Sequence, residues 1–196
     1  MTKVVGIVGW KDVGKTFFVT EVINLLVKKG YKVGTVKHAH HDFDIDKPGT
    51  DSFKHRQSGA SEVIISSSKR WAKIIENNNK TEKKLNELLR EFNDVDLVIV
   101  EGFKKENHPK IEIMGKGLKN TNKDISNVVA IVSDELLHSS IPVFKKNDNE
   151  GLVEFIINSV KLSTSFVINK GILDFIFCSA TIATTFFISL LTIFEF

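Results

Sequence analysis

Apolar and polar positions alternate in blocks along this chain, in a pattern that predicts a layered α/β fold. Continuous apolar runs at residues 4–8, 97–100 and 128–132 are typical of parallel strands covered on both faces. Between these runs, apolar residues recur at helical spacing, as in Phe18, Val22, Leu25 and Leu26. Strands alternating with helices indicate an open, mostly parallel sheet.

The same patterns and their flanking turn residues give an expected order of elements. We expect helices at residues 15–29, 50–58, 81–92 and 149–161, with Thr50 or Asp51 capping the second and Thr81 the third. Strands are expected at residues 4–8, 31–37, 62–66, 70–75, 94–101, 127–134 and 141–144. The lysine-rich stretch 103–124 is expected to hold little regular structure apart from a short strand at residues 110–114.

The first strand leads directly into residues 9–16, Gly-Trp-Lys-Asp-Val-Gly-Lys-Thr, which match the pattern G-x-x-x-x-G-K-[ST]. This pattern between a strand and a helix predicts a P-loop, whose backbone N–H groups and helix N-terminus bind phosphate. Lys15 would contact the β- and γ-phosphates, and the Thr16 hydroxyl would bind Mg²⁺. The alternative, a chance glycine turn before a helix, is disfavoured by this context. The expected fold class is therefore a P-loop NTPase-like sheet flanked by helices.

Glu101 ends the apolar strand 97–100 and is the expected acid partner of the P-loop. A carboxylate at this strand end could hold Mg²⁺ or its waters, although an acid there could also be merely solvated. The following Gly102 would let the loop approach a phosphate closely. Asp134 ends a later strand and could accept a pair of N–H groups from a base, on the weak signal of an isolated Ser-Asp.

A polar, histidine-rich segment follows the strand at residues 31–37. It contains His38, His40, His41, Asp42, Asp44 and Asp46 and ends at Pro48-Gly49. The spacing without cysteine does not match a structural zinc site. We expect a loop beside the nucleotide, in which an acid such as Asp42 contacts Mg²⁺ and His38 meets a ligand or partner; a solvated loop is the alternative.

The composition limits the class of partner, the cellular location and the number of domains. The formal net charge is +3 without a long basic run, which gives no case for nucleic acid as a partner. A single cysteine, Cys178, excludes an internal disulfide and suits a reducing, cytoplasmic location. The length suits one domain, expected at residues 1–161, followed by an apolar tail at 162–196.

The tail contains no charged residue from Phe175 to Phe194. Such a run is long enough to span a bilayer, and Lys161 and Lys170 before it would keep the domain on the cytoplasmic side. An extra packed helix and a non-native C-terminus are the alternatives. The tail alone supports a third function, a nucleotide-dependent scaffold at the membrane.

Several motifs together resemble the MobB family of molybdopterin-guanine dinucleotide biosynthesis adaptors over residues 3–160. They are the P-loop, the segment Val33 to Gly49, the stretch Ser52 to Glu62, Asp96 to Lys104, and Pro109 to Glu112. Trp10 and Val13 depart from the usual P-loop, where smaller or polar residues are common, but the phosphate contacts use backbone N–H groups.

The resemblance implies a GTP-binding protein with weak GTPase activity, usually a homodimer, that assists a MobA-type guanylyltransferase and could bind molybdopterin. By matching positions, the resemblance implies a phosphate site at residues 9–16, Glu101 as the Walker-B-like acid, and the loop of residues 38–49 near the phosphates. With Asp134 added from its place at a strand end, the residues expected to bind nucleotide are Gly9, Asp12, Val13, Gly14, Lys15, Thr16, His38, Asp42 and Asp134, and those expected to serve Mg²⁺ and catalysis are Lys15, Thr16 and Glu101. A small P-loop kinase acting on a metabolite is the alternative. The three arginines of the chain, Arg56, Arg70 and Arg90, speak modestly against it, because such kinases use lid arginines.

Overall fold

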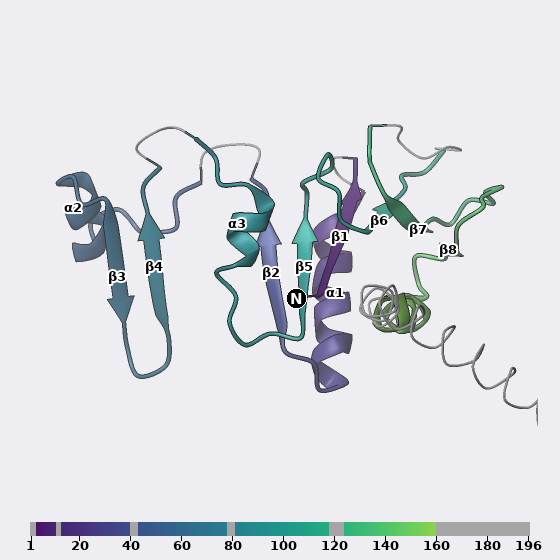
Figure 1. The fold of residues 1–196 in the computed structure, drawn as a ribbon, viewed down its shortest axis with the longest axis horizontal. Coiled ribbons are helices and arrows are strands. Elements are labelled where there is room, and N and C mark those ends of the chain that lie inside the picture. Colours follow the sequence, from purple (N-terminus) through teal and green to yellow (C-terminus); the bar gives the residue numbers. More distant parts are fainter. Residues whose placement is uncertain (1–2, 11–12, 40–42, 78–80, 118–123, 160–196) are drawn as a thin grey trace, which may run out of the picture.

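The computed structural model describes residues 3–10, 13–39, 43–77, 81–117 and 124–159. Six parallel strands form the main sheet in the order β2-β5-β1-β6-β7-β8 (Figure 1). Their bounds are β1 Lys3–Gly9, β2 Val33–Lys37, β5 Leu97–Glu101, β6 Lys110–Ile113, β7 Val128–Val132 and β8 Val143–Phe144. The predicted parallel α/β architecture is therefore confirmed.

Helices cover both faces of this sheet. Helix α1 (Lys15–Lys28) and the helical residues 149–159 bury apolar side chains against one face, which includes Val5, Ile7 and Ile99. The short helix α3 (Leu85–Leu89) packs on the other face through Leu85, against Val98 and Val100. Because side chains alternate across a strand, β5 supplies apolar residues to both cores, as its uninterrupted apolar run predicts.

A second unit is inserted between β2 and β5. It consists of helix α2 (Asp51–Gln57) and an antiparallel hairpin of β3 (Glu62–Ser66) and β4 (Trp71–Ile75), which lie beside the main sheet at its β2 edge (Figure 1). The Thr50 hydroxyl accepts a hydrogen bond from the Phe53 N–H, which confirms Thr50 as the cap of α2. Val63 is the one residue of this hairpin with less than a tenth of its surface exposed.

One expectation needs correction. Helix α3 begins at Leu85 with Lys84 as its cap, not at Thr81, because the Glu87 carboxylate accepts the Lys84 backbone N–H at 2.8 Å and fixes the first turn there. The short strand expected at residues 110–114 is confirmed as β6, which pairs with β1 and β7 and whose four residues are all buried.

Strand β6 also carries polar side chains into the interior. The Lys110 ammonium is enclosed by carbonyl oxygens of Glu106, His108 (3.1 Å) and Ser126 (2.9 Å), and by the Ser126 hydroxyl at 3.3 Å. The neighbouring His108 ring lies over Gly6, where a Cβ would approach its Nε2 to 2.5 Å. This cage ties the loop after β5 to the segment before β7.

No helix in the described ranges is long and apolar enough to cross a membrane. The apolar tail at 162–196 lies outside them, so its role and the division of the chain at residue 161 stay predictions.

We predict that His108 makes the protein sensitive to mild acid. Burial, with a smaller contribution from the Lys110 charge, lowers the pKa of His108 to about 4. Between pH 6.5 and 4 the unfolded chain therefore binds a proton that the folded chain does not, and the free energy of unfolding falls by up to about 3 kcal/mol, with no further loss from this group below pH 4. Urea titrations of the parent and of His108→Phe between pH 7.5 and 4 measure this slope, which should be smaller in the variant.

The matched control is His138→Phe, since His138 is an exposed histidine on a loop. It should keep the parent's slope. An equal slope in His108→Phe and the parent would assign the acid sensitivity to other groups.

Candidate functional site

The carboxyl ends of the six parallel strands meet at one edge of the sheet, which is where open α/β folds bind ligands (Figure 1). β1 lies in the interior of this sheet, flanked by β5 and β6. The loops after β1, β2 and β5 therefore converge at this edge. They carry the glycine-rich loop, His38 and Glu101, and the sheet thus brings these three sequence-predicted features together.

The glycine-rich loop begins against the end of β6. A Cβ at Gly9 would lie 2.5 Å from the Ile113 carbonyl oxygen, so only glycine fits this approach without a shift of the backbone. Gly14 has φ 85° and is the N-cap of α1, a left-handed conformation that also favours glycine. Val13 packs against the core. The two motif glycines thus bend the chain around the start of α1; Lys11 and Asp12 lie outside the described residues.

Lys15 spans this loop. Its ammonium donates a hydrogen bond to the Trp10 carbonyl at 2.5 Å, which holds the positive charge over the loop beside the N-terminus of α1. The ammonium and the helix N-terminus together favour an anion at this point. The arrangement fits the phosphate role predicted for Lys15.

Thr16 and Glu101 come from α1 and β5 and lie close together. The Thr16 hydroxyl donates to Glu101 Oε1 at 3.5 Å, and the Glu101 side chain keeps 14% of its surface exposed. A hydroxyl and a carboxylate oxygen at this separation are the ligand types that Mg²⁺ takes, together with water and phosphate. The two residues are therefore suited to hold a Mg²⁺ ion that bridges to phosphate.

The structure adds Lys37, which sequence reasoning missed. Lys37 ends β2 and is in register with Glu101, and its ammonium lies 3.5 Å from Glu101 Oε1. This contact follows from the insertion of β5 between β1 and β2, which no local pattern announces. The candidate site thus contains a second lysine, Lys37, beside the acid that is predicted to bind Mg²⁺.

His38 is held next to Glu101 by its backbone and its ring. Its N–H donates to the Glu101 carbonyl at 2.9 Å, its Nε2 lies 2.8 Å from Glu82 Oε1, and its ring stacks on Phe103 at 4.7 Å between centroids. Gly102 has φ 99°, and a Cβ there would lie 2.8 Å from the His38 Cβ. His38 is thus placed at the predicted site, with its ring nitrogen toward Glu82.

The other members of the histidine-rich segment divide into two groups. His40, His41 and Asp42 lie outside the described residues. Asp44 pairs with Arg56 at 2.7 Å, and Asp46 accepts hydrogen bonds from Thr50 and Ser52, so these two acids organise the start of the inserted unit. Within the described ranges, no three His, Cys, Asp or Glu side chains gather to hold a metal ion.

Asp134 follows β7 at the same edge of the sheet, two strands away from β1. Its Oδ1 accepts the Lys146 backbone N–H at 3.2 Å, which ties the ends of β7 and β8 together. The side chain is exposed. Its role in base recognition stays a prediction.

Trp10 joins the glycine-rich loop to the loop after β5. The Lys104 ammonium lies over the Trp10 ring, 5.6 Å from its centroid. Such cation–π contacts are worth about 0.5–1 kcal/mol at exposed sites. The residue that departs from the usual loop composition thus contacts the segment that follows Glu101.

Known proteins resemble this chain over most of its length. Residues 4–134 match the family "Molybdopterin guanine dinucleotide synthesis protein B", MobB. The chain is 34% identical over 162 residues, 80% of its length, to the molybdopterin-guanine dinucleotide biosynthesis adapter protein of Escherichia coli (strain K12), of which 93% is covered. It is 31% identical over 156 residues to the protein of the same name in Haemophilus influenzae, with 78% and 86% of the two chains covered.

Solved structures of similar proteins share this fold. The crystal structure of a molybdopterin-guanine biosynthesis protein B (mobB) superposes with a TM-score of 0.65 at 27% identity, covering 81% of this chain and 99% of that one. The crystal structure of Bacillus subtilis MobB, at 23% identity, shares the fold with a TM-score of 0.64 over 80% and 96% of the two chains.

We expect Lys15→Ala to weaken binding of Mg²⁺-nucleotide at least about tenfold, because one charge-assisted contact to phosphate is removed while the apolar core is unchanged. Isothermal titration with GTP and ATP measures the effect, and circular dichroism checks that the variant is folded. Lys28→Ala, at the opposite end of α1, is the matched control and should bind as the parent does. Equal affinities in folded Lys15→Ala and the parent would contradict the phosphate assignment.

Proposed function

This chain belongs to the MobB family, whose curated members are named adapters of molybdopterin-guanine dinucleotide biosynthesis, and we propose that it is a GTP-binding adapter in that pathway. Family membership supports the role as adapter. The proposal adds that the nucleotide binds with Mg²⁺ at the glycine-rich loop and that the protein assists a MobA-type guanylyltransferase.

One observation carries the nucleotide part of the proposal, the contact between Thr16 and Glu101 at the start of α1. It joins a hydroxyl from the glycine-rich loop and an acid from the neighbouring strand. Lys15 directly precedes Thr16, and the Lys37 ammonium lies 3.5 Å from the same carboxylate oxygen. Two ammonium groups and a divalent ion together would balance most of the charge of a triphosphate. In this proposal the protein hydrolyses GTP only slowly.

The contacts of Arg56 weigh against a metabolite kinase. Kinases of this fold stabilise the transferring phosphoryl group with lid arginines. Arg56 instead donates to Asp44 at 2.7 Å and to Glu76 at 2.6 Å within the inserted unit. Arg70 lies at the turn of the hairpin and Arg90 at the end of α3. We therefore favour the adapter.

A homodimer formed through the inserted hairpin is part of the proposal. Large apolar side chains are exposed on one face of the hairpin, with Ile64 of β3 at 64% and Trp71 of β4 at 70% exposure, together with Ile75. Monomeric proteins rarely leave so many on one small element, because contiguous apolar patches of this kind usually meet a partner. The cytoplasmic location expected from the sequence stays a prediction.

We predict that the purified full-length protein increases the rate at which a MobA-type transferase joins GMP to molybdopterin, and that it phosphorylates no small acceptor by itself. The rate at which the transferase forms molybdopterin-guanine dinucleotide is measured without the protein, with the parent, with Glu101→Gln, and with Glu91→Gln as the control. Loss of stimulation in Glu101→Gln alone would tie the effect to the Mg²⁺ site, since an amide is a poorer cation ligand. Metabolite-dependent release of ADP or GDP without the transferase would favour the kinase instead.

We expect the parent to sediment as a dimer and the double variant Ile64→Lys/Trp71→Lys to sediment as a monomer, because two charges would be buried in the proposed interface. Leu136→Lys, at a fully exposed loop position, is the control and should remain dimeric. Nucleotide affinity should be the same in all three proteins, since the hairpin lies outside the glycine-rich loop. A dimer that persists in the folded double variant would rule out the hairpin as its interface.

A further inference from the structure

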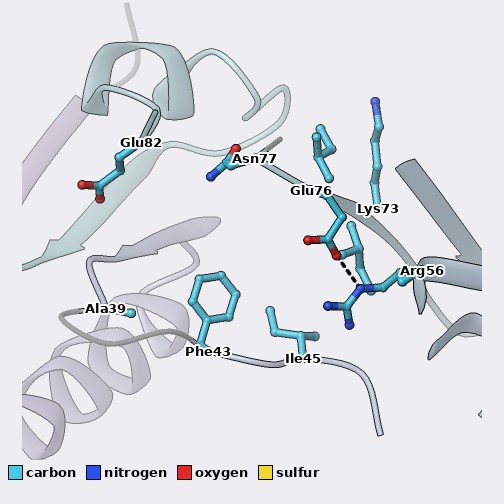
Figure 2. Close-up of a pocket in the computed structure, with 10 residues that line it drawn as sticks. Ala39, Phe43, Ile45, Arg56, Lys73, Glu76, Asn77 and Glu82 are labelled. Atoms are coloured by element: carbon cyan, nitrogen blue, oxygen red, sulfur yellow. Dashed lines mark hydrogen bonds and ion pairs between the residues drawn. The ribbon is translucent and has the colours of Figure 1, made fainter. Parts of the chain in front are cut away.

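A cavity of about 620 Å³ lies between the hairpin and the segment that follows β2 (Figure 2). Residues from the loop after β2, from α2, from β4 and from the segment before α3 line it. Its volume is in the range of sites that bind a small organic molecule. Ile75 of the exposed hairpin face also lines the cavity, and the functions assigned above use none of its other lining residues.

The wall formed by α2 and β4 is held in place by Arg56. The guanidinium binds Asp44 from the loop after β2 and Glu76 from the end of β4, and only 14% of the side chain is exposed. These contacts raise the pKa of Arg56 and lower that of Asp44, so the pair of Arg56 with Asp44 stays charged across the physiological range. Three separate elements are thereby fixed around the cavity, so this wall is formed before any ligand binds.

The cavity has two chemically different sides. Phe43 and Ile45 lie along one side, and Glu82, Asn77 and Glu76 lie along the other (Figure 2). Phe43 and Ile45 are each 71% exposed, so a flat apolar ring laid against them would remove substantial apolar surface from water. The opposite side offers carboxylate and amide oxygens, which accept hydrogen bonds from N–H groups.

Glu82 connects the cavity to the candidate nucleotide site. It lines the cavity, and its Oε1 is paired with His38 Nε2 at 2.8 Å. The His38 backbone in turn donates to the carbonyl of Glu101. The cavity lies on the β2 side of β1, whereas Asp134 lies on the β7 side. A ligand in the cavity would therefore lie beside the phosphate end of the site, opposite the side expected for the base.

We propose that this cavity binds the pterin ring of molybdopterin, an inference that rests on the function proposed above. A pterin is flat and carries a 2-amino-4-oxopyrimidine edge, an N–H pair beside a carbonyl. The Glu82 carboxylate accepts the N–H pair while one of its oxygens keeps the His38 contact, the Asn77 amide donates to the carbonyl, and Phe43 stacks on the ring. Guanine presents the same edge, so the test must separate the two.

The test uses the full-length protein and the fluorescent compound 6-hydroxymethylpterin as the probe. Fluorescence titration should give saturable binding by the parent. Phe43→Ala should weaken it about tenfold through loss of a stacking partner, and Phe43→Tyr should restore it. Glu82→Gln should weaken binding to a similar extent, whereas Glu91→Gln, which changes an exposed acid paired with Lys83, should not. MgGTP affinity should be unchanged in Phe43→Ala.

Competition with GMP tests whether the cavity binds a pterin or a guanine, since both rings present the same hydrogen-bonding edge. It is added to the pterin complex of Lys15→Ala, in which the phosphate site is disabled. Retention of the pterin supports the inference, and displacement by GMP would mean that the cavity reads guanine and would overturn the assignment to pterin. Equal pterin affinity in the parent, Phe43→Ala and Glu82→Gln would also overturn it. A parent that binds MgGTP but no pterin would refute the cavity site alone, and one that binds neither would refute the adapter proposal as well.

Discussion

The position of β1 between β5 and β6 is the constraint on which the fold and the candidate site both depend. Ile7 and Val8 are almost completely buried, and both edges of the strand are paired. β1 ends at the carboxyl edge of the sheet. At this point the Ile113 carbonyl leaves no room for a side chain at residue 9. A glycine is required there for packing, and the loop that it starts is thereby delivered to the start of α1.

The polar residues of β6 extend this constraint to the loops around the site. A lysine enclosed in the interior loses hydration, and only good acceptors offset that loss. Lys110 obtains them from backbone carbonyls on both sides of β6. Those carbonyls belong to the segment that follows Glu101 and to the one that precedes β7. The buried ammonium thus fixes the base of the loop from which Lys104 reaches Trp10.

What could be predicted from the sequence was largely local. The buried strands, α1, the hairpin and the cap of α2 follow from apolar periodicity and turn residues, and the structure confirms them. The start of α3 was predicted wrongly, because Thr81 is a good cap by type whereas Glu87 selects Lys84. The central place of β6 was not foreseen, since four residues with alternating polar side chains resemble an exposed strand until the neighbours that bury them are known.

The candidate site divides in the same way. The glycine-rich loop, Lys15, Thr16 and Glu101 have a local signature, and the sheet brings them together. Lys37 has no local signature, because its place beside Glu101 depends on the pairing of β2 with β5. The whole inserted unit separates these two strands in the sequence. The pair of His38 with Glu82 is equally non-local. Strand order, not sequence spacing, decides which charged groups meet.

Competition for the Glu101 carboxylate gives these non-local contacts a functional meaning. Oε1 serves both Thr16 and Lys37 at 3.5 Å, a distance at which each hydrogen bond or ion pair is weak. A divalent cation at the same oxygen would repel the Lys37 ammonium and outweigh its attraction, because the cation carries twice the charge and sits closer. Lys37 would then be directed toward phosphate oxygens, the nearest negative charge. The His38 N–H is bonded to the Glu101 backbone carbonyl, and the His38 ring pairs with Glu82 at the wall of the cavity. The site that we assign to nucleotide and the cavity that we assign to pterin thus share contacts with two adjacent residues at the end of β2, Lys37 and His38.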